Sequence, residues 1–217
     1  MKLYLPEDIT IQTFDDSEAE RKNLAQIFPY EANGSKERIK ELQAKGAGIY
    51  FATNPQQDSL TRGVKFTTRF QYLSLDLDVA KEKENLEMVE ISRLRGNLLV
   101  TLTGLSLPPY GAMITKNGIQ PVWKFSNPRD LPDGDSRLKA NFEYKVMVKA
   151  VTKVLGQRSE GNSICRVIRF PDSLHLKNSA NPFKITYQEI SGQECTFEEF
   201  NKAYPVVQTE NVKSSTT

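Results

Sequence analysis

At 217 residues, the chain is long enough to bury one sizeable core or two small lobes, but too short for two large domains. Hydrophobic residues make up 38% of it and charged residues 26%, which excludes a disordered chain, and no apolar run is long enough to span a bilayer. The formal net charge of +2 neither requires nor excludes nucleic acid, so any basic groove has to be local.

The first third of the chain shows helical patterns followed by strand patterns. No apolar run of signal-peptide length precedes Pro6, so we expect a cytoplasmic protein. Apolar residues at helical spacing predict two helices within residues 15–45. Aromatic and β-branched residues then predict a strand at 49–53 and, after a polar loop, another at 69–79.

The rest of the chain also mixes both patterns. Asn117-Gly118 between two apolar runs predicts a tight hairpin, and Cys165 and Cys195 form no CxxC pair. With a single histidine in the chain, no zinc site can be assembled. The remaining predicted elements are a charged helix at 81–93, a short apolar stretch at 98–102, a loop at 127–136, a long helix at 138–155, strands at 166–170 and 183–190, and a short helix from Thr196.

Two aspartates stand at the end of the strand predicted at 69–79. A period of two puts Asp76 and Asp78 on one face of that strand and Leu75 and Leu77 on the other. Two adjacent carboxylates repel each other unless a cation lies between them, and hard oxygen ligands suit Mg²⁺ or Mn²⁺. A solvated or salt-bridged pair on an exposed strand is the alternative for a bare DxD motif.

Two later segments offer groups that bind phosphate. The hairpin at 115–123 combines turn N–H groups with Lys116 and Gln120, although an ordinary hairpin would look the same. Four potential phosphate donors then fall within twelve residues, and a solvated basic face is the alternative there. Those four residues are Arg166, Arg169, His175 and Lys177.

These three features, in this order, resemble the motifs of the archaeo-eukaryotic primase superfamily, in particular its plasmid, phage and CRISPR-associated primase-polymerases. The resemblance spans roughly residues 46–184. Residues 75–78 are similar to the first motif, an hDhD strand, and residues 115–123 correspond to the second. At Gln120 many members carry a histidine that touches the incoming triphosphate.

The third motif is matched with departures. Arg169-Phe170-Pro171 followed by His175-Leu176-Lys177 resembles the RxPG-then-N/HxK signature of the family, although Asp172 replaces the usual glycine. The family normally supplies a third acid just before this strand. Asn162 is our candidate for that position, because asparagine keeps the shape of aspartate without its charge, and Glu160 is the alternative ligand.

The resemblance implies an α+β (α/β) fold, with an N-terminal α/β lobe packed on an RRM-like sheet and the active site in the cleft between them. Residues 1–204 would form a single catalytic core of two lobes, and 205–217 a flexible tail or the start of a linker. Asp76, Asp78 and the residue at 162 would be catalytic, with both aspartates binding metal. The implied nucleotide- and phosphate-binding residues are Lys116, Asn117, Gln120, Arg169, His175 and Lys177.

The implied function is that of a DNA primase-polymerase, which makes or extends primers on single-stranded DNA by template-directed nucleotidyl transfer. It would use two Mg²⁺ or Mn²⁺ ions, a template and primer, and dNTPs or rNTPs, without a membrane. Helicase, CRISPR or other replication proteins are possible partners in a larger assembly. Two alternatives stay open: another DxD-dependent nucleotidyltransferase or nuclease, and a catalytically inactive nucleic-acid-binding replication module.

Overall fold

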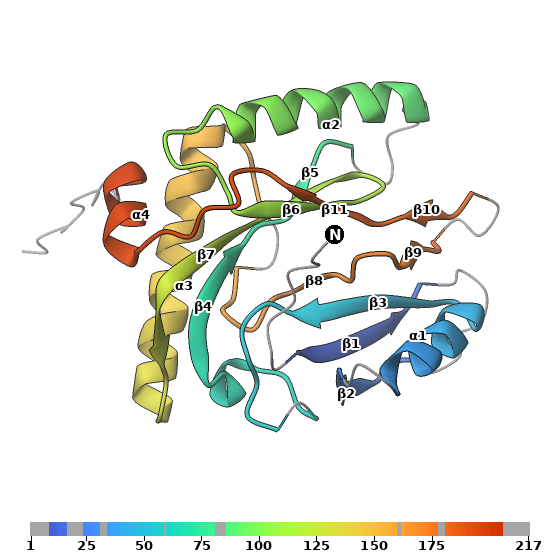
Figure 1. The fold of residues 1–217 in the computed structure, drawn as a ribbon, viewed down its shortest axis with the longest axis horizontal. Coiled ribbons are helices and arrows are strands. Elements are labelled where there is room, and N and C mark those ends of the chain that lie inside the picture. Colours follow the sequence, from blue (N-terminus) through green and yellow to red (C-terminus); the bar gives the residue numbers. More distant parts are fainter. Residues whose placement is uncertain are drawn as a thin grey trace, which may run out of the picture.

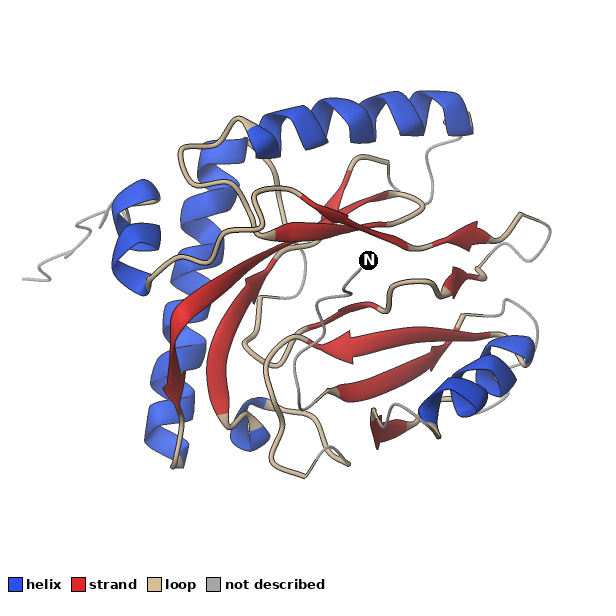
Figure 2. Ribbon diagram, viewed as in Figure 1, coloured by secondary structure: helices blue, strands red, loops and turns tan. Residues whose placement is uncertain are grey.

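Two antiparallel sheets face each other, and the helices cover their outer sides (Figures 1 and 2). The computed structural model describes residues 9–16, 24–30, 34–58, 60–80, 86–159, 162–177 and 181–205. The smaller sheet has the strand order β2-β1-β3-β8, and the larger has β11-β6-β7-β4 with β5 paired to β7. The α+β class predicted from the sequence is confirmed.

The strands of the smaller sheet are β1 (Thr10–Asp15), β2 (Ile27–Pro29), β3 (Ala47–Ala52) and β8 (Val167–Arg169). Those of the larger sheet are β4 (Arg69–Ser74), β5 (Leu77–Asp78), β6 (Gly111–Ile114), β7 (Gly118–Asp130) and β11 (Thr186–Glu189). A separate two-stranded ribbon joins β9 (Leu174–His175) to β10 (Phe183–Lys184). The helices are α1 (Ser35–Ala44), α2 (Met88–Thr103), α3 (Gly134–Leu155) and α4 (Phe197–Ala203), with a 3₁₀ turn at Val64–Phe66. No helix in these described segments is long and apolar enough to cross a membrane.

One core lies between the larger sheet and the helices α2, α3 and α4, where Trp123 and Tyr144 are almost completely buried. Local sequence sets the limits of the helices on this side. The Asp133 carboxylate accepts the N–H of Ser136 at 2.7 Å, in a capping box that starts α3. Gly156 ends the same helix in the left-handed conformation, at φ 62°.

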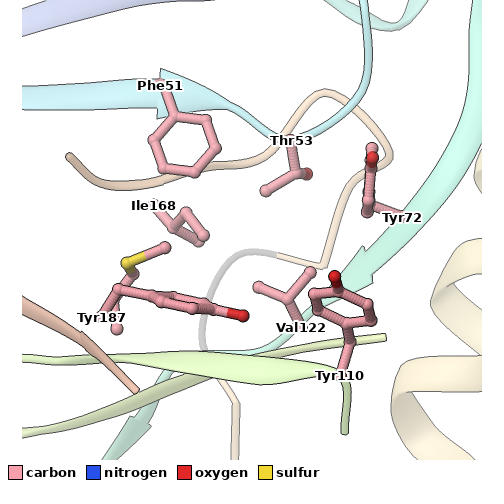
Figure 3. A pocket seen from close by; sticks show the side chains of 8 residues that line it. Phe51, Thr53, Tyr72, Tyr110, Val122, Ile168 and Tyr187 are labelled. Atoms are coloured by element: carbon pink, nitrogen blue, oxygen red, sulfur yellow. The ribbon is translucent and has the colours of Figure 1, made fainter. Parts of the chain in front are cut away.

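A second core fills the space between the two sheets (Figure 3). Phe51 and Ile168 come from the smaller sheet, and Tyr72, Val122 and Tyr187 face them from the larger one. The side chains leave a cavity of about 20 Å³, which is enough for one water molecule. The two sheets are therefore in apolar contact, with a small gap at their centre.

Several sequence-based expectations about local structure were wrong. Only one helix, α1, lies in the described part of residues 15–45, because the apolar residues at 27–29 pair with β1 as an edge strand. The loop predicted at 127–136 begins later, since β7 continues to Asp130 opposite Arg69. Residues 98–102 belong to α2, which starts at Met88, and residues 81–85 and the tail at 206–217 lie outside the described residues.

Candidate functional site

The strand predicted at 69–79 is interrupted, because β4 ends at Ser74 and β5 covers only Leu77–Asp78, so Asp76 lies between the two strands. The alternation that the sequence predicts is nevertheless kept. Leu75 and Leu77 are fully buried in the helix-covered core, whereas Asp76 is half-buried and Asp78 exposed. The neighbouring strand β7 holds this segment in register, because Leu75 N–H donates to the Pro121 carbonyl at 3.1 Å and Leu77 pairs with Ile119. The carboxylates therefore lie on the face of the sheet opposite the core.

Backbone hydrogen bonds join the hairpin between β6 and β7 to the segment that carries the two aspartates. The Asn117 carbonyl accepts the N–H groups of Val79 and Ala80 at 2.9 and 3.3 Å. A Cβ atom on Gly118 would collide with the Leu77 carbonyl, so only glycine fits where the hairpin crosses β5. Lys116 and Asn117 are half-buried at the tip of this hairpin. The predicted hairpin is thus present and adjoins the two aspartates.

Both oxygens of the Asp76 carboxylate have partners within the protein. Oδ1 accepts a hydrogen bond from Gln120 Nε2, and Oδ2 accepts one from Arg166 Nη2, each at 2.9 Å. Gln120 also accepts the backbone N–H of Arg169 at 2.8 Å, so its amide uses both its donor and its acceptor. Because Gln120 stands on the larger sheet and Arg169 on the smaller, this residue links the two lobes beside Asp76.

The segment proposed to supply the third acid is bonded to Asp76 on both sides of Asn162. The Asp76 N–H donates to Ser159 Oγ at 3.1 Å, and Arg166 reaches the carboxylate. Oδ1 of Asn162 is buried without a hydrogen-bond partner, which leaves an amide oxygen available as a ligand. Glu160, the alternative ligand, lies outside the described residues.

The donor set fits a hard divalent cation in its chemistry but is incomplete. Two carboxylates and an amide oxygen are the ligand types that Mg²⁺ and Mn²⁺ prefer. Among the residues with described positions, however, no three His, Cys, Asp or Glu side chains are grouped to hold a metal. The guanidinium of Arg166 supplies positive charge to Asp76 in the arrangement seen.

A cationic cluster, formed by Lys116, Arg169 and Lys177, surrounds the only histidine. His175 is 7% exposed, and its Nδ1 has no hydrogen-bond partner. Burial, followed by the positive charges of Arg169, Lys177 and Lys116, lowers the pKa of this imidazole from 6.5 to about 3. A buried neutral ring with an unused nitrogen, under three positive charges, is a favourable place for an anion. The sequence-predicted residues Lys116, Arg169, His175 and Lys177 are therefore electrostatically coupled in the fold.

The Arg169 guanidinium has a partner that sequence reasoning missed. Its Nη1 lies 2.5 Å from Oδ2 of Asp16, which is 5% exposed, and its plane covers the Tyr50 ring at 4.2 Å. The two residues of this ion pair are 153 positions apart in the sequence. A lone acid next to an aromatic strand gives no sequence signal for such a pair.

No protein-family model and no curated protein matches the sequence. Solved structures do match. The archaeo-eukaryotic primase domain of the cyanophage S-2L primase-polymerase superposes with a TM-score of 0.61, at 12% identity, over 91% of this chain and 89% of its own. The catalytic domain of primase RepB′, solved in complex with initiator DNA, gives 0.51 at 11% identity, over 91% of this chain and 85% of its own. At such identities the likeness is one of fold, and this chain has the catalytic-domain fold of the archaeo-eukaryotic primases.

Proposed function

We propose that this chain is a primase-type nucleotidyltransferase, a DNA primase-polymerase that joins dNTPs or rNTPs on a single-stranded DNA template. One observation carries the proposal: hydrogen bonds link the half-buried carboxylate of Asp76 through Gln120 to the backbone of Arg169, which belongs to the cationic cluster around His175. Nucleotidyl transfer requires this combination, with acids for cations beside donors for a triphosphate.

Each side chain has a role in this proposal. Asp76 and Asp78, with the Asn162 amide oxygen, would hold two Mg²⁺ or Mn²⁺ ions. When bound, these ions would activate the 3′-hydroxyl and stabilise the leaving pyrophosphate. Lys116, His175 and Lys177 would contact the triphosphate, while Gln120 orients Asp76. The backbone around Asn117 fixes the distance between the hairpin and the acids, and the Arg169 side chain shares its charge with Asp16.

A second function is favoured by the same site. The incomplete acid set and the Arg166–Asp76 ion pair fit a nucleic-acid-binding module without turnover. Such a protein would need the cationic cluster around His175 but no cation at Asp76. A third possibility, nuclease activity through the same aspartates, is separated from the other two by its product.

Primer extension on a single-stranded DNA template, with dNTPs or rNTPs and with Mn²⁺ or Mg²⁺, distinguishes these functions. A lengthened strand indicates a polymerase, a shortened strand a nuclease, and a mobility shift alone a binding module. An unprimed template with labelled nucleotides tests whether synthesis starts de novo. We expect lengthening, because the chain has both the acids and the cationic cluster around His175.

Matched aspartate variants assign the activity to the site. Asp76→Asn and Asp78→Asn should each reduce extension by about 100-fold or more, since each removes several kcal/mol of charge stabilisation. Asp130→Asn is the control, because this exposed acid at the end of β7 forms a surface ion pair with Arg69. Circular dichroism verifies that the variants fold. Undiminished extension by Asp76→Asn would remove the proposed metal site.

A further inference from the structure

Arg166 forms an ion pair with Asp76, the first of the proposed metal ligands. Its Nη2 lies 2.9 Å from Oδ2 of Asp76, and the side chain of Arg166 is only 8% exposed. Gln120 takes the other carboxylate oxygen. A divalent cation that approached Asp76 would therefore meet a guanidinium already paired with its ligand.

The two positive groups cannot share Asp76 at little cost. Each would repel the other at a separation of a few ångströms in a partly desolvated site, where charges interact more strongly than in water. The main chain of Arg166 is fixed, because its N–H donates to Ser163 at 2.9 Å and its carbonyl accepts the Thr53 N–H at 3.2 Å. Only the side chain can move away, and an anion placed beside it would favour that movement.

A nucleoside triphosphate supplies such an anion. Its oxygens match the planar fork of an arginine, which binds phosphate through paired hydrogen bonds. In the proposed function the triphosphate lies at the cationic cluster around His175, and one member of that cluster, Arg169, ends β8 only three residues beyond Arg166. Arg166 can thus exchange a carboxylate for a phosphate while its backbone stays in place.

We propose that Arg166 competes with the divalent cation for Asp76, so that the cation binds weakly to the free protein and tightly only together with the nucleotide. This inference rests on the proposed function. Arg166 is then a positioning residue that couples the two binding events. Because coupling free energies are reciprocal, the cation should also strengthen nucleotide binding by the same factor.

Equilibrium binding of Mn²⁺, followed by electron paramagnetic resonance without template or turnover, tests the proposal. Arg166→Gln should bind Mn²⁺ about tenfold or more tightly than the unmodified chain in the absence of nucleotide, since a competing charge is gone. Arg62→Gln is the matched control. This substitution also removes one positive charge, but Arg62 donates hydrogen bonds to Gln12 and to the Cys165 carbonyl rather than to Asp76. The affinity of the Arg62→Gln protein for Mn²⁺ should therefore differ little from that of the unmodified chain.

A non-hydrolysable deoxynucleoside triphosphate analogue provides the second measurement. It should tighten Mn²⁺ binding by the unmodified chain about tenfold or more, and clearly less in Arg166→Gln. Should Arg166→Gln not fold, Arg166→Lys keeps the buried charge without the fork, and its Mn²⁺ affinity should fall between the two.

Three results would overturn the inference. Equal Mn²⁺ affinity in Arg166→Gln and the unmodified chain excludes competition, and an equal gain in Arg62→Gln reduces the effect to general charge. Equal nucleotide coupling in both proteins excludes the exchange of partners.

If Asp76→Asn leaves Mn²⁺ binding unchanged with and without the analogue, the metal site and the proposed function fail together. If Asp76→Asn abolishes it, only the role of Arg166 is in question.

Discussion

Replacing His175 with asparagine should remove a pH-dependent part of the free energy of unfolding. In the folded chain the pKa of His175 is lowered from 6.5 to about 3, so the ring stays neutral where the unfolded chain binds a proton. The unfolded state therefore gains protons between these two values, and stability is lost as the pH falls from 6.5 towards 3. At pH 7 almost none of this loss has occurred.

The size of the effect follows from the two pKa values. A shift from 6.5 to about 3 corresponds in full to about 5 kcal/mol, and between pH 7 and pH 5 about 2 kcal/mol of it is realised. For a chain of this length, that loss would lower Tm by about 4–8 °C. His175→Asn carries no titrating ring, so it should lack this part of the pH dependence.

Urea unfolding of both proteins at pH 7 and pH 5 measures the difference. The carboxylates titrate in both proteins, so comparing their pH dependences isolates the histidine. Because His175 is the only histidine in the chain, its imidazole signal in NMR is also unambiguous. Binding of tripolyphosphate to the cationic cluster should raise the pKa of His175 by adding negative charge beside it. Equal pH dependence in the two proteins, or an imidazole pKa near 6.5 in the free chain, would refute this account of the surroundings of His175.

Three further predictions concern other parts of the site. Asp16→Ala leaves the buried Arg169 guanidinium without its carboxylate partner and should lower the free energy of unfolding, measured in urea, by about 3–5 kcal/mol. The double variant with Arg169→Met should lose less stability than the sum of the two single variants, and additive losses would exclude the ion pair. Asn162→Asp should increase primer extension and Mn²⁺ affinity by restoring a charged ligand, and no gain in either counts against its place as the third ligand. Asp172 has a φ of 61°, so Asp172→Gly should be more stable than Asp172→Ala by about 1 kcal/mol in thermal unfolding; equal stabilities would argue against that conformation.

The features that sequence predicts well here are local. Asn117-Gly118 indicates the hairpin, the period of two places Asp76 and Asp78, and Thr196 with Glu199 caps α4 in the structure as a capping box. The family glycine missing at Asp172 is also explained, because this aspartate still adopts the left-handed backbone that the turn requires. Each of these depends on a few neighbouring residues.

The rest of the site depends on contacts between distant residues, which periodicity cannot reveal. The partners of Asp76 are 44 and 90 positions away at Gln120 and Arg166. The sequence pattern of β1 does not predict a strand, and pairing with β3 stabilises it. The apolar residues at 27–29 fit a helix or a strand, and pairing with β1 decides in favour of the strand. Tertiary contacts thus override the local pattern in the N-terminal part of the chain.

The smaller sheet is completed by β8, a strand from the last third of the sequence, and this restricts how the chain can be divided or synthesised. Its partner β3 ends at Ala52, more than a hundred positions earlier, with the whole of α3 between them. During synthesis, β3 remains an open edge until residues 167–169 have left the ribosome. A fragment that stops after α3 would keep that edge exposed and would be prone to aggregate, so the two lobes cannot be separated at a single point in the chain.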